Sequence, residues 1–184
     1  MKEKGMKTKI RTITWGVMSL WLCGFWASGA YGLTEKQLSL KDIKEVYVFV
    51  QGLTEETKKE GLTSDVVQKR IEKKLKALGI GVVSEEESLK IPGSPVLYVN
   101  ISTGKRKEAA AYVYHVDIGL MQKIRLERDE KIRMMGITWT KGQMGHCPSQ
   151  SFAKTVGETI DYLMGQFEED WKQANPDAQV KKEK

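Results

Sequence analysis

The feature that most constrains the fold is a regular alternation of side chains over residues 112–127. The even positions are mostly apolar, whereas the odd positions include His115, Asp117 and several charged residues. Successive side chains of a β-strand point to opposite faces of a sheet, so this period of two predicts a long strand with one buried and one wet face. Such strands are typical of antiparallel sheets.

Four more strands and two helices are expected from shorter patterns. Apolar and β-branched runs bounded by turn residues predict strands at 45–51, 80–84, 96–102 and 131–141. Two other stretches place apolar residues three or four apart, as on the buried face of an amphipathic helix. The first stripe is Val67, Ile71, Leu75 and Leu78, and the second is Phe152, Val156, Ile160, Leu163, Phe167 and Trp171.

The order of these elements predicts the α+β class. A strand–helix–strand unit comes first and favours two parallel strands, and an antiparallel meander and a long C-terminal helix follow. The expected architecture is a mixed five-stranded sheet. Both helices carry an apolar stripe that must be buried, so we expect both to pack on one face of the sheet.

The N-terminal 30 residues are typical of a secretory signal peptide. A cationic stretch ends at Arg11, an apolar run follows over 13–27, and small residues occupy 28–30. We therefore expect cleavage after Ala30 and a periplasmic or secreted protein. The alternative is an uncleaved anchor, since residues 12–34 carry no charge. After the signal we expect a linker at 31–44, one domain at 45–176 and a disordered charged tail at 177–184.

The net charge of +6 belongs mostly to the signal. Residues 1–30 hold five basic and one acidic side chain, which leaves 25 basic and 23 acidic side chains in the remainder. A domain so close to neutrality lacks the electrostatic signature of a nucleic-acid-binding protein. We expect no nucleic-acid partner, and membrane contact only through an uncleaved anchor.

The last two strands are expected to form a hairpin whose turn is centred on Asp129. This register pairs Trp139 with Gly119, Ile137 with Met121, and Arg133 with Arg125. An aromatic ring laid over a glycine is a common way to cover a bare strand. Facing arginines repel each other unless an anionic group lies between them.

The wet face of this hairpin is the predicted docking site. It combines apolar side chains with a cationic rim, as interaction surfaces often do. The partner would be an envelope protein or an anionic envelope component. In the alternative interpretation a loop covers the patch and the arginines extend into water. The predicted partner-binding residues are Met121, Lys123, Arg125, Arg133, Met135, Ile137 and Trp139.

A second hypothesis places chemistry at Cys147. Cys23 leaves with the signal, so Cys147 has no cysteine to pair with inside the mature chain. A helix N-terminus and His146 would lower the pKa of its thiol, and Met144, His146 and Cys147 together offer soft ligands for Cu(I). A structural cysteine is the third reading. No catalytic or cofactor motif of any specificity is present, so we expect no cofactor and favour a protein that is not an enzyme.

Several landmarks resemble a group of exported bacterial proteins of unknown function. The resemblance covers roughly residues 45–176 and implies export and one compact domain, without an activity, a cofactor or a catalytic residue. The matching positions are Val50, Gly52, Leu53, Gly61, Leu62, Thr63, Leu75, Gly79, Ile80, residues 95–100, Thr138, Trp139, Asn175 and Pro176. Together these observations predict a noncatalytic accessory or binding module of the cell envelope.

Overall fold

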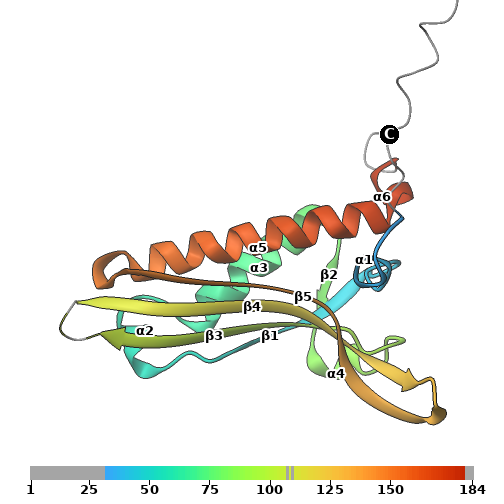
Figure 1. Cartoon of the computed structure of the whole chain (residues 1–184). Coiled ribbons are helices and arrows are strands. Elements are labelled where there is room, and N and C mark those ends of the chain that lie inside the picture. Colours follow the sequence, from blue (N-terminus) through green and yellow to red (C-terminus); the bar gives the residue numbers. More distant parts are fainter. Residues whose placement is uncertain (1–31, 107, 109, 181–184) are drawn as a thin grey trace, which may run out of the picture. The chain divides into compact units, whose positions relative to one another are not determined.

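A mixed sheet of five strands forms the centre of the fold, in the order β2-β1-β3-β4-β5 (Figure 1). β1 is parallel to both β2 and β3, whereas β3, β4 and β5 form an antiparallel meander. This confirms the α+β class and the mixed five-stranded sheet. The strands are β1 (Glu45–Gln51), β2 (Gly81–Val83), β3 (Val96–Arg106), β4 (Ala111–Leu126) and β5 (Asp129–Pro148).

The computed structural model describes residues 32–106, 108 and 110–180. The expected signal peptide therefore lies outside the described residues. From Leu33 onward the chain forms one compact unit. None of the described helices is long and apolar enough to cross a membrane.

Two amphipathic helices, α3 (Ser64–Leu78) and α5 (Phe152–Ala174), cover one face of the sheet. All the apolar residues of both predicted stripes are buried. They meet the even-numbered side chains of β4 from Tyr112 to Leu120 and the inward side chains of β1 and β3 in one core cluster. The other face of the sheet, called the open face below, carries the alternate side chains of the same strands.

Local chemistry sets both ends of α3. The Thr63 hydroxyl accepts a hydrogen bond from the Val66 N–H, which satisfies one of the free donors at the helix start. Gly79 ends the helix in the left-handed conformation, with φ of 84°. Its N–H donates to carbonyls of the last helical turn.

Short helices occupy segments that the apolar pattern left as loops. They are α1 (Glu35–Leu38), α2 (Glu55–Lys59), α4 (Glu85–Ser88), a 3-10 turn at Ser149–Ser151, and α6 (Pro176–Val180). A capping box starts α1, α2 and α4, with Thr34, Thr54 and Ser84 as the capping residues. The sequence pattern of a hydroxyl residue followed three residues later by Glu or Gln is present for α1 and α4, whereas the partner in α2 is Thr57.

Two predicted boundaries were wrong. Residues 31–44 are not simply a polar linker, because Leu40 and Ile43 are buried in the core and α1 contacts α5. At the other end, residues 176–180 form α6 rather than a disordered tail, and Ala178 packs against the core. Residues 181–184 lie outside the described part of the chain.

β5 is longer than predicted because two glycines lie inside it rather than in turns. Gly145 faces the ring of Tyr114, and a Cβ on Gly145 would come within 2.5 Å of the Tyr114 hydroxyl oxygen. Gly142 lies in the same way against the Asp117 carboxylate. A glycine within a strand often marks such a close approach of a neighbour.

Part of the predicted hairpin register was wrong, because a β-bulge shifts the pairing between Leu120 and Met121 by one residue. Ile137 lies opposite Met121 and Arg133 opposite Arg125, as expected, but Trp139 lies opposite Leu120 instead of Gly119. Thr138 is the extra residue at the register shift between Leu120 and Met121. The bulge turns Trp139 to the helix-covered face, where it is 1% exposed.

Trp139 is consequently a core residue. Its ring meets Phe167 edge-on at 5.2 Å between centroids, and its Nε1 donates to the Asp170 carboxylate at 2.9 Å. Burial by itself raises the pKa of Asp170, but the donors Trp139, Gln37 and Lys141 outweigh it and hold the pKa below its usual value. The Asp170 carboxylate thus connects α5 to Trp139 and Lys141 of β5 and to Gln37 of α1.

Candidate docking surface

Apolar side chains cross the open face of the sheet in adjacent rows. Strand pairing places Tyr47, Val96, Met121 and Ile137 side by side on four neighbouring strands. The next row begins with Phe49 and Tyr98 and continues to Gly119. Phe49 is 40% exposed and Ile137 is 56% exposed, while the other side chains of the two rows are partly covered.

Tyr98 is the residue that covers Gly119. A Cβ on Gly119 would overlap the Tyr98 ring, so the glycine is required for this contact. Sequence analysis gave this position to Trp139. The cover comes from β3 on the other side of β4, which the pattern of the hairpin alone does not reveal.

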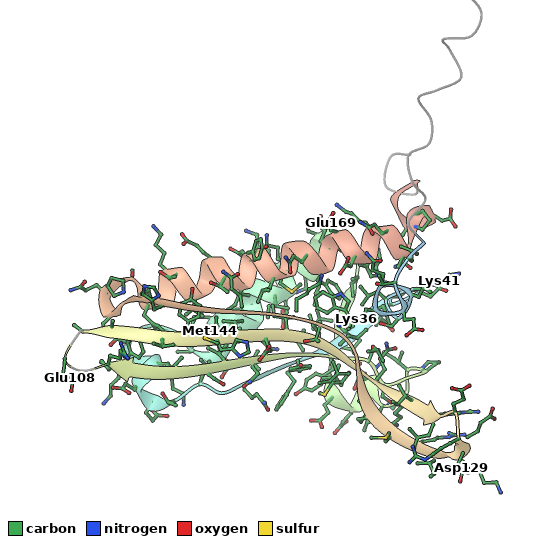
Figure 2. The ribbon with its side chains drawn as sticks, viewed as in Figure 1. Lys36, Lys41, Glu108, Asp129, Met144 and Glu169 are labelled. Carbon is green, nitrogen blue, oxygen red and sulfur yellow. The ribbon has the colours of Figure 1, made fainter. Side chains whose placement is uncertain are left out.

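Beyond these rows, the β4–β5 hairpin continues without further strands beside it. The last β3 pairing of β4 joins Val96 to Met121, so residues 122–136 form a two-stranded ribbon, called the arm below. Figure 2 labels Asp129 at its tip, away from the helices. None of the residues 121–138 belongs to the core cluster.

Both faces of the arm expose apolar side chains. Met135, on the side that continues the open face, is 41% exposed. Ile132 and Met134, on the opposite side, are 43% and 50% exposed. A ribbon of two strands is only marginally stable in water by itself, and it gains nothing from apolar side chains that nothing covers. Such side chains mark a contact surface.

The positive charge of the arm is concentrated on the side of the open face. Arg125 and Arg133 are Cα partners across the hairpin, and both are exposed. Neither arginine forms an ion pair within the described part of the chain. Lys123, one pair closer to the sheet, is exposed on the same side. Like charges that face each other repel, so an anionic group between them would be stabilising.

The structure brings six of the seven predicted docking residues together. Met121, Lys123, Arg125, Arg133, Met135 and Ile137 lie on one continuous side of the hairpin, whereas Trp139 is buried on the other side. Sequence analysis missed the part of the surface formed by Tyr47, Phe49, Val96 and Tyr98. A signal was available, because the first strand has apolar side chains on both faces while the sequence predicts only two helices, both on one face.

Cys147 lies on the helix-covered face, apart from its sequence neighbours. Its thiol is in the core, and burial raises its pKa above the usual value, outweighing a hydrogen bond with Thr155. Met144 is 71% exposed and His146 is also exposed, because alternate residues of β5 point to opposite faces. The strand thus separates Cys147 from Met144 and His146, which share the open face, and no group of three His, Cys, Asp or Glu residues in the described ranges is placed to hold a metal ion.

His115 and Asp117 are neighbours on the open face. The His115 Nδ1 lies 3.1 Å from an Asp117 carboxylate oxygen, so the carboxylate orients the imidazole. Oriented imidazoles serve as bases when a nucleophile or an acidic substrate proton is within reach. On the neighbouring strand β3, Ser102 lies opposite His115 and Asn100 lies opposite Asp117.

Comparison with known proteins shows a structural likeness to solved proteins. No family model matches the chain, and no curated protein sequence matches it. A solved structure of a PelC variant from Paraburkholderia phytofirmans, described as a dodecamer, is similar over 66% of this chain and 85% of that chain, with 16% identity and a TM-score of 0.42. A likeness of that size carries no argument about function or assembly.

Proposed function

We propose that this protein is an exported, noncatalytic binding module of the cell envelope that docks onto its partner through the arm. The carrying observation is that the arm combines exposed apolar side chains on both faces with two unpaired arginines that face each other. The exported location rests on the order of cationic, apolar and small residues in the first 30 positions.

The two apolar faces favour a protein partner over a charged polymer. A partner that only neutralised charge would leave Ile132, Met134 and Met135 in water. A protein cleft that takes in the arm from both sides would bury all three, and each fully buried aliphatic side chain contributes about 1.5–3 kcal/mol. We therefore favour an envelope protein with an apolar cleft, and an anionic envelope polymer is the second candidate.

The arginines favour a cleft with an acidic lining. Arg125 and Arg133 present planar guanidinium groups that bind carboxylates through two hydrogen bonds each. A carboxylate between them would also remove their mutual repulsion. Binding should therefore weaken as the salt concentration rises, since exposed charges are screened.

The test is recruitment in the native envelope. The tagged chain would be crosslinked in cells, purified and analysed by mass spectrometry, in parallel with Arg125→Glu/Arg133→Glu and with Met135→Ser/Ile137→Ser. We expect one acidic protein to accompany the wild type and to be lost from both variants. In a parallel purification without crosslinker, salt should release it.

A matched control is available on α3. Lys69→Glu/Lys73→Glu makes the same charge change on exposed helix positions away from the hairpin. This control should keep the partner. Retention of the partner by a folded Arg125→Glu/Arg133→Glu variant, or its equal loss from the α3 control, would refute docking through the arm.

A further inference from the structure

A groove with mostly uncharged polar walls runs between α5 and the β4–β5 strands. It is shallow and open to solvent, with a volume of about 540 Å³, which falls in the range of about 300–1,000 Å³ that is usual for small-molecule sites. Its main side chains are Tyr114 and Gln143 from the strands and Thr159, Tyr162 and Gln166 from the helix. The groove lies on the helix-covered side of β5, whereas Met135 and Ile137 lie on the side of the open face.

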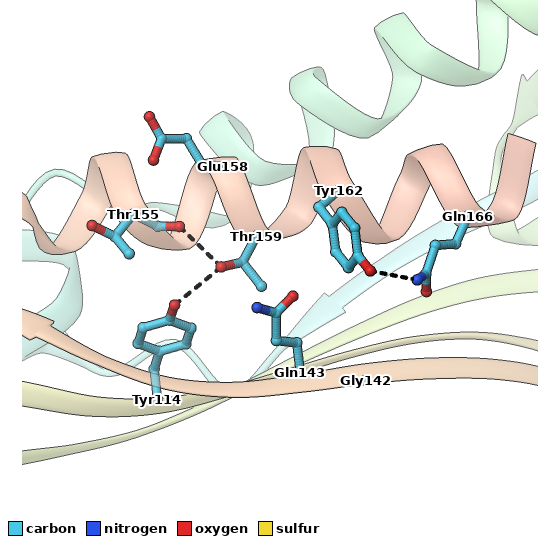
Figure 3. Close-up of a pocket in the computed structure, with 8 residues that line it drawn as sticks. All are labelled: Tyr114, Gly142, Gln143, Thr155, Glu158, Thr159, Tyr162 and Gln166. Atoms are coloured by element: carbon cyan, nitrogen blue, oxygen red, sulfur yellow. Dashed lines mark hydrogen bonds between the residues drawn. The ribbon is translucent and has the colours of Figure 1, made fainter.

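A chain of hydroxyl groups forms the floor of the groove (Figure 3). The Thr159 hydroxyl donates to the Thr155 carbonyl at 3.0 Å and lies 3.1 Å from the Tyr114 hydroxyl. A hydroxyl has one proton, so Thr159 accepts the proton of Tyr114. Tyr114 and Thr159 are each 5% exposed, so this bonded pair closes the floor beneath the groove.

The upper wall offers an aromatic face and further donors and acceptors. Tyr162 is 58% exposed, and its hydroxyl accepts a hydrogen bond from Gln166 Nε2 at 2.9 Å. This leaves the Tyr162 proton and the Gln166 carbonyl oxygen to a ligand. Gln143 adds an exposed amide from β5, with both a donor and an acceptor. In Figure 3 the side chains of Tyr162 and Gln143 point into the space between α5 and the strands.

The charges of the lining restrict the class of ligand. Glu158 is the one ionisable acid or base in the lining besides the tyrosines, and its carboxylate points away from the strands in Figure 3. The lining therefore has no guanidinium or ammonium group to bind a phosphate, and no aliphatic wall to bind a lipid chain. Amides, hydroxyls and an aromatic face suit a ligand rich in hydroxyl groups with apolar C–H faces.

We propose that this groove binds a neutral saccharide. One sugar ring stacks on Tyr162, and its hydroxyl groups bond to Gln143 and Gln166. The site is independent of the arm, because it uses the other side of β5 and none of the docking residues. A module with both features would hold a protein partner with the arm and a glycan with the groove.

A glycan array probed with the full-length protein tests the proposal. The protein is kept in a detergent without a sugar headgroup, and the array carries neutral and anionic glycans. We expect binding to one or more neutral glycans, roughly tenfold weaker in Tyr162→Ala and in Gln143→Ala. Tyr162→Phe keeps the ring and should stay within roughly threefold of the wild type, because stacking does not need the hydroxyl.

The other outcomes separate this site from the docking surface. Arg125→Glu/Arg133→Glu should bind glycans as the wild type does, whether or not arm docking is correct. The groove is not a saccharide site if no neutral glycan binds. The same conclusion follows if only anionic glycans bind, or if folded Tyr162→Ala binds every neutral glycan as tightly as Tyr162→Phe.

Discussion

The reactivity of Cys147 depends on which face of β5 its side chain points to. Its position before the long helix and beside His146 suggested an activated thiol. The side chain instead points into the core, where burial stabilises the neutral thiol and raises its pKa. His146 points to the open face and cannot assist as a base. The thiolate is the nucleophilic form, so the position gives a slow rather than a fast nucleophile.

We predict that Cys147 reacts slowly in the folded protein. In a Cys23→Ser background at neutral pH, iodoacetamide should modify Cys147 at least about tenfold more slowly than it modifies the urea-unfolded chain. Mass spectrometry over time gives both rates. The double variant Cys147→Ser/Met144→Cys moves the thiol to an exposed position of the same strand and should react at the rate of an unfolded chain. A folded Cys147 faster than that control would restore the hypothesis of an activated thiol.

At the scale of elements, two glycines have opposite effects on their helices. Gly79 ends α3 with φ of 84°, a conformation that costs other residues free energy because their Cβ approaches the following carbonyl oxygen. Gly165 lies exposed in the middle of α5, where a Cβ would meet nothing within 4 Å. There a glycine only adds conformational freedom to the unfolded chain.

The same substitution should therefore change stability in opposite directions at these positions. Gly79→Ala should lower the free energy of unfolding by about 1 kcal/mol. Gly165→Ala should raise it by about 0.5–1 kcal/mol. Urea unfolding followed by circular dichroism measures both. Equal signs for the two variants would contradict this account of how α3 ends.

At the scale of the whole molecule, the core and the arm have separate roles. The described core lies between the sheet and the helices α3 and α5, and it includes Leu120 and Trp139 at the base of the hairpin. Past these residues the arm contributes no side chain to the core. Its apolar residues therefore do little for folding, which is the reason to assign them to binding.

Shortening the arm should consequently leave the domain folded. Lys123 and Met135 are partners across the hairpin, so a two-residue Asn-Gly turn can replace residues 124–134 between them. We expect a melting temperature within about 3 °C of the wild type, because the removed residues lie outside the core and their loss should change the free energy of unfolding by less than about 1 kcal/mol. Recruitment of the partner should be lost completely. A large fall in melting temperature would show instead that the arm supports the fold.

The sequence by itself determined the strands and helices whose apolar side chains recur at a regular spacing. The alternation over 112–127 and the two helical stripes identify β4, α3 and α5, because a period of two or of 3.6 residues is set by the backbone of the element itself. Arg125 and Arg133 face each other as predicted, but the turn lies at residues 127–128 rather than at Asp129, and a second register shift between Arg125 and Leu126 accounts for the difference. The capping boxes of α1 and α4 also follow a local sequence pattern, Ser or Thr followed three residues later by Gln or Glu.

Only the tertiary structure decided which side chains meet across elements. One inserted residue, Thr138, moves Trp139 from the open face to the core, because a bulge reverses the facing of a strand whose side-chain period is two. The cover of Gly119 by Tyr98 and the groove between Tyr114 and Tyr162 depend on strand order and on where α5 crosses β5. Residues distant in sequence come together there through packing, and no local pattern records that.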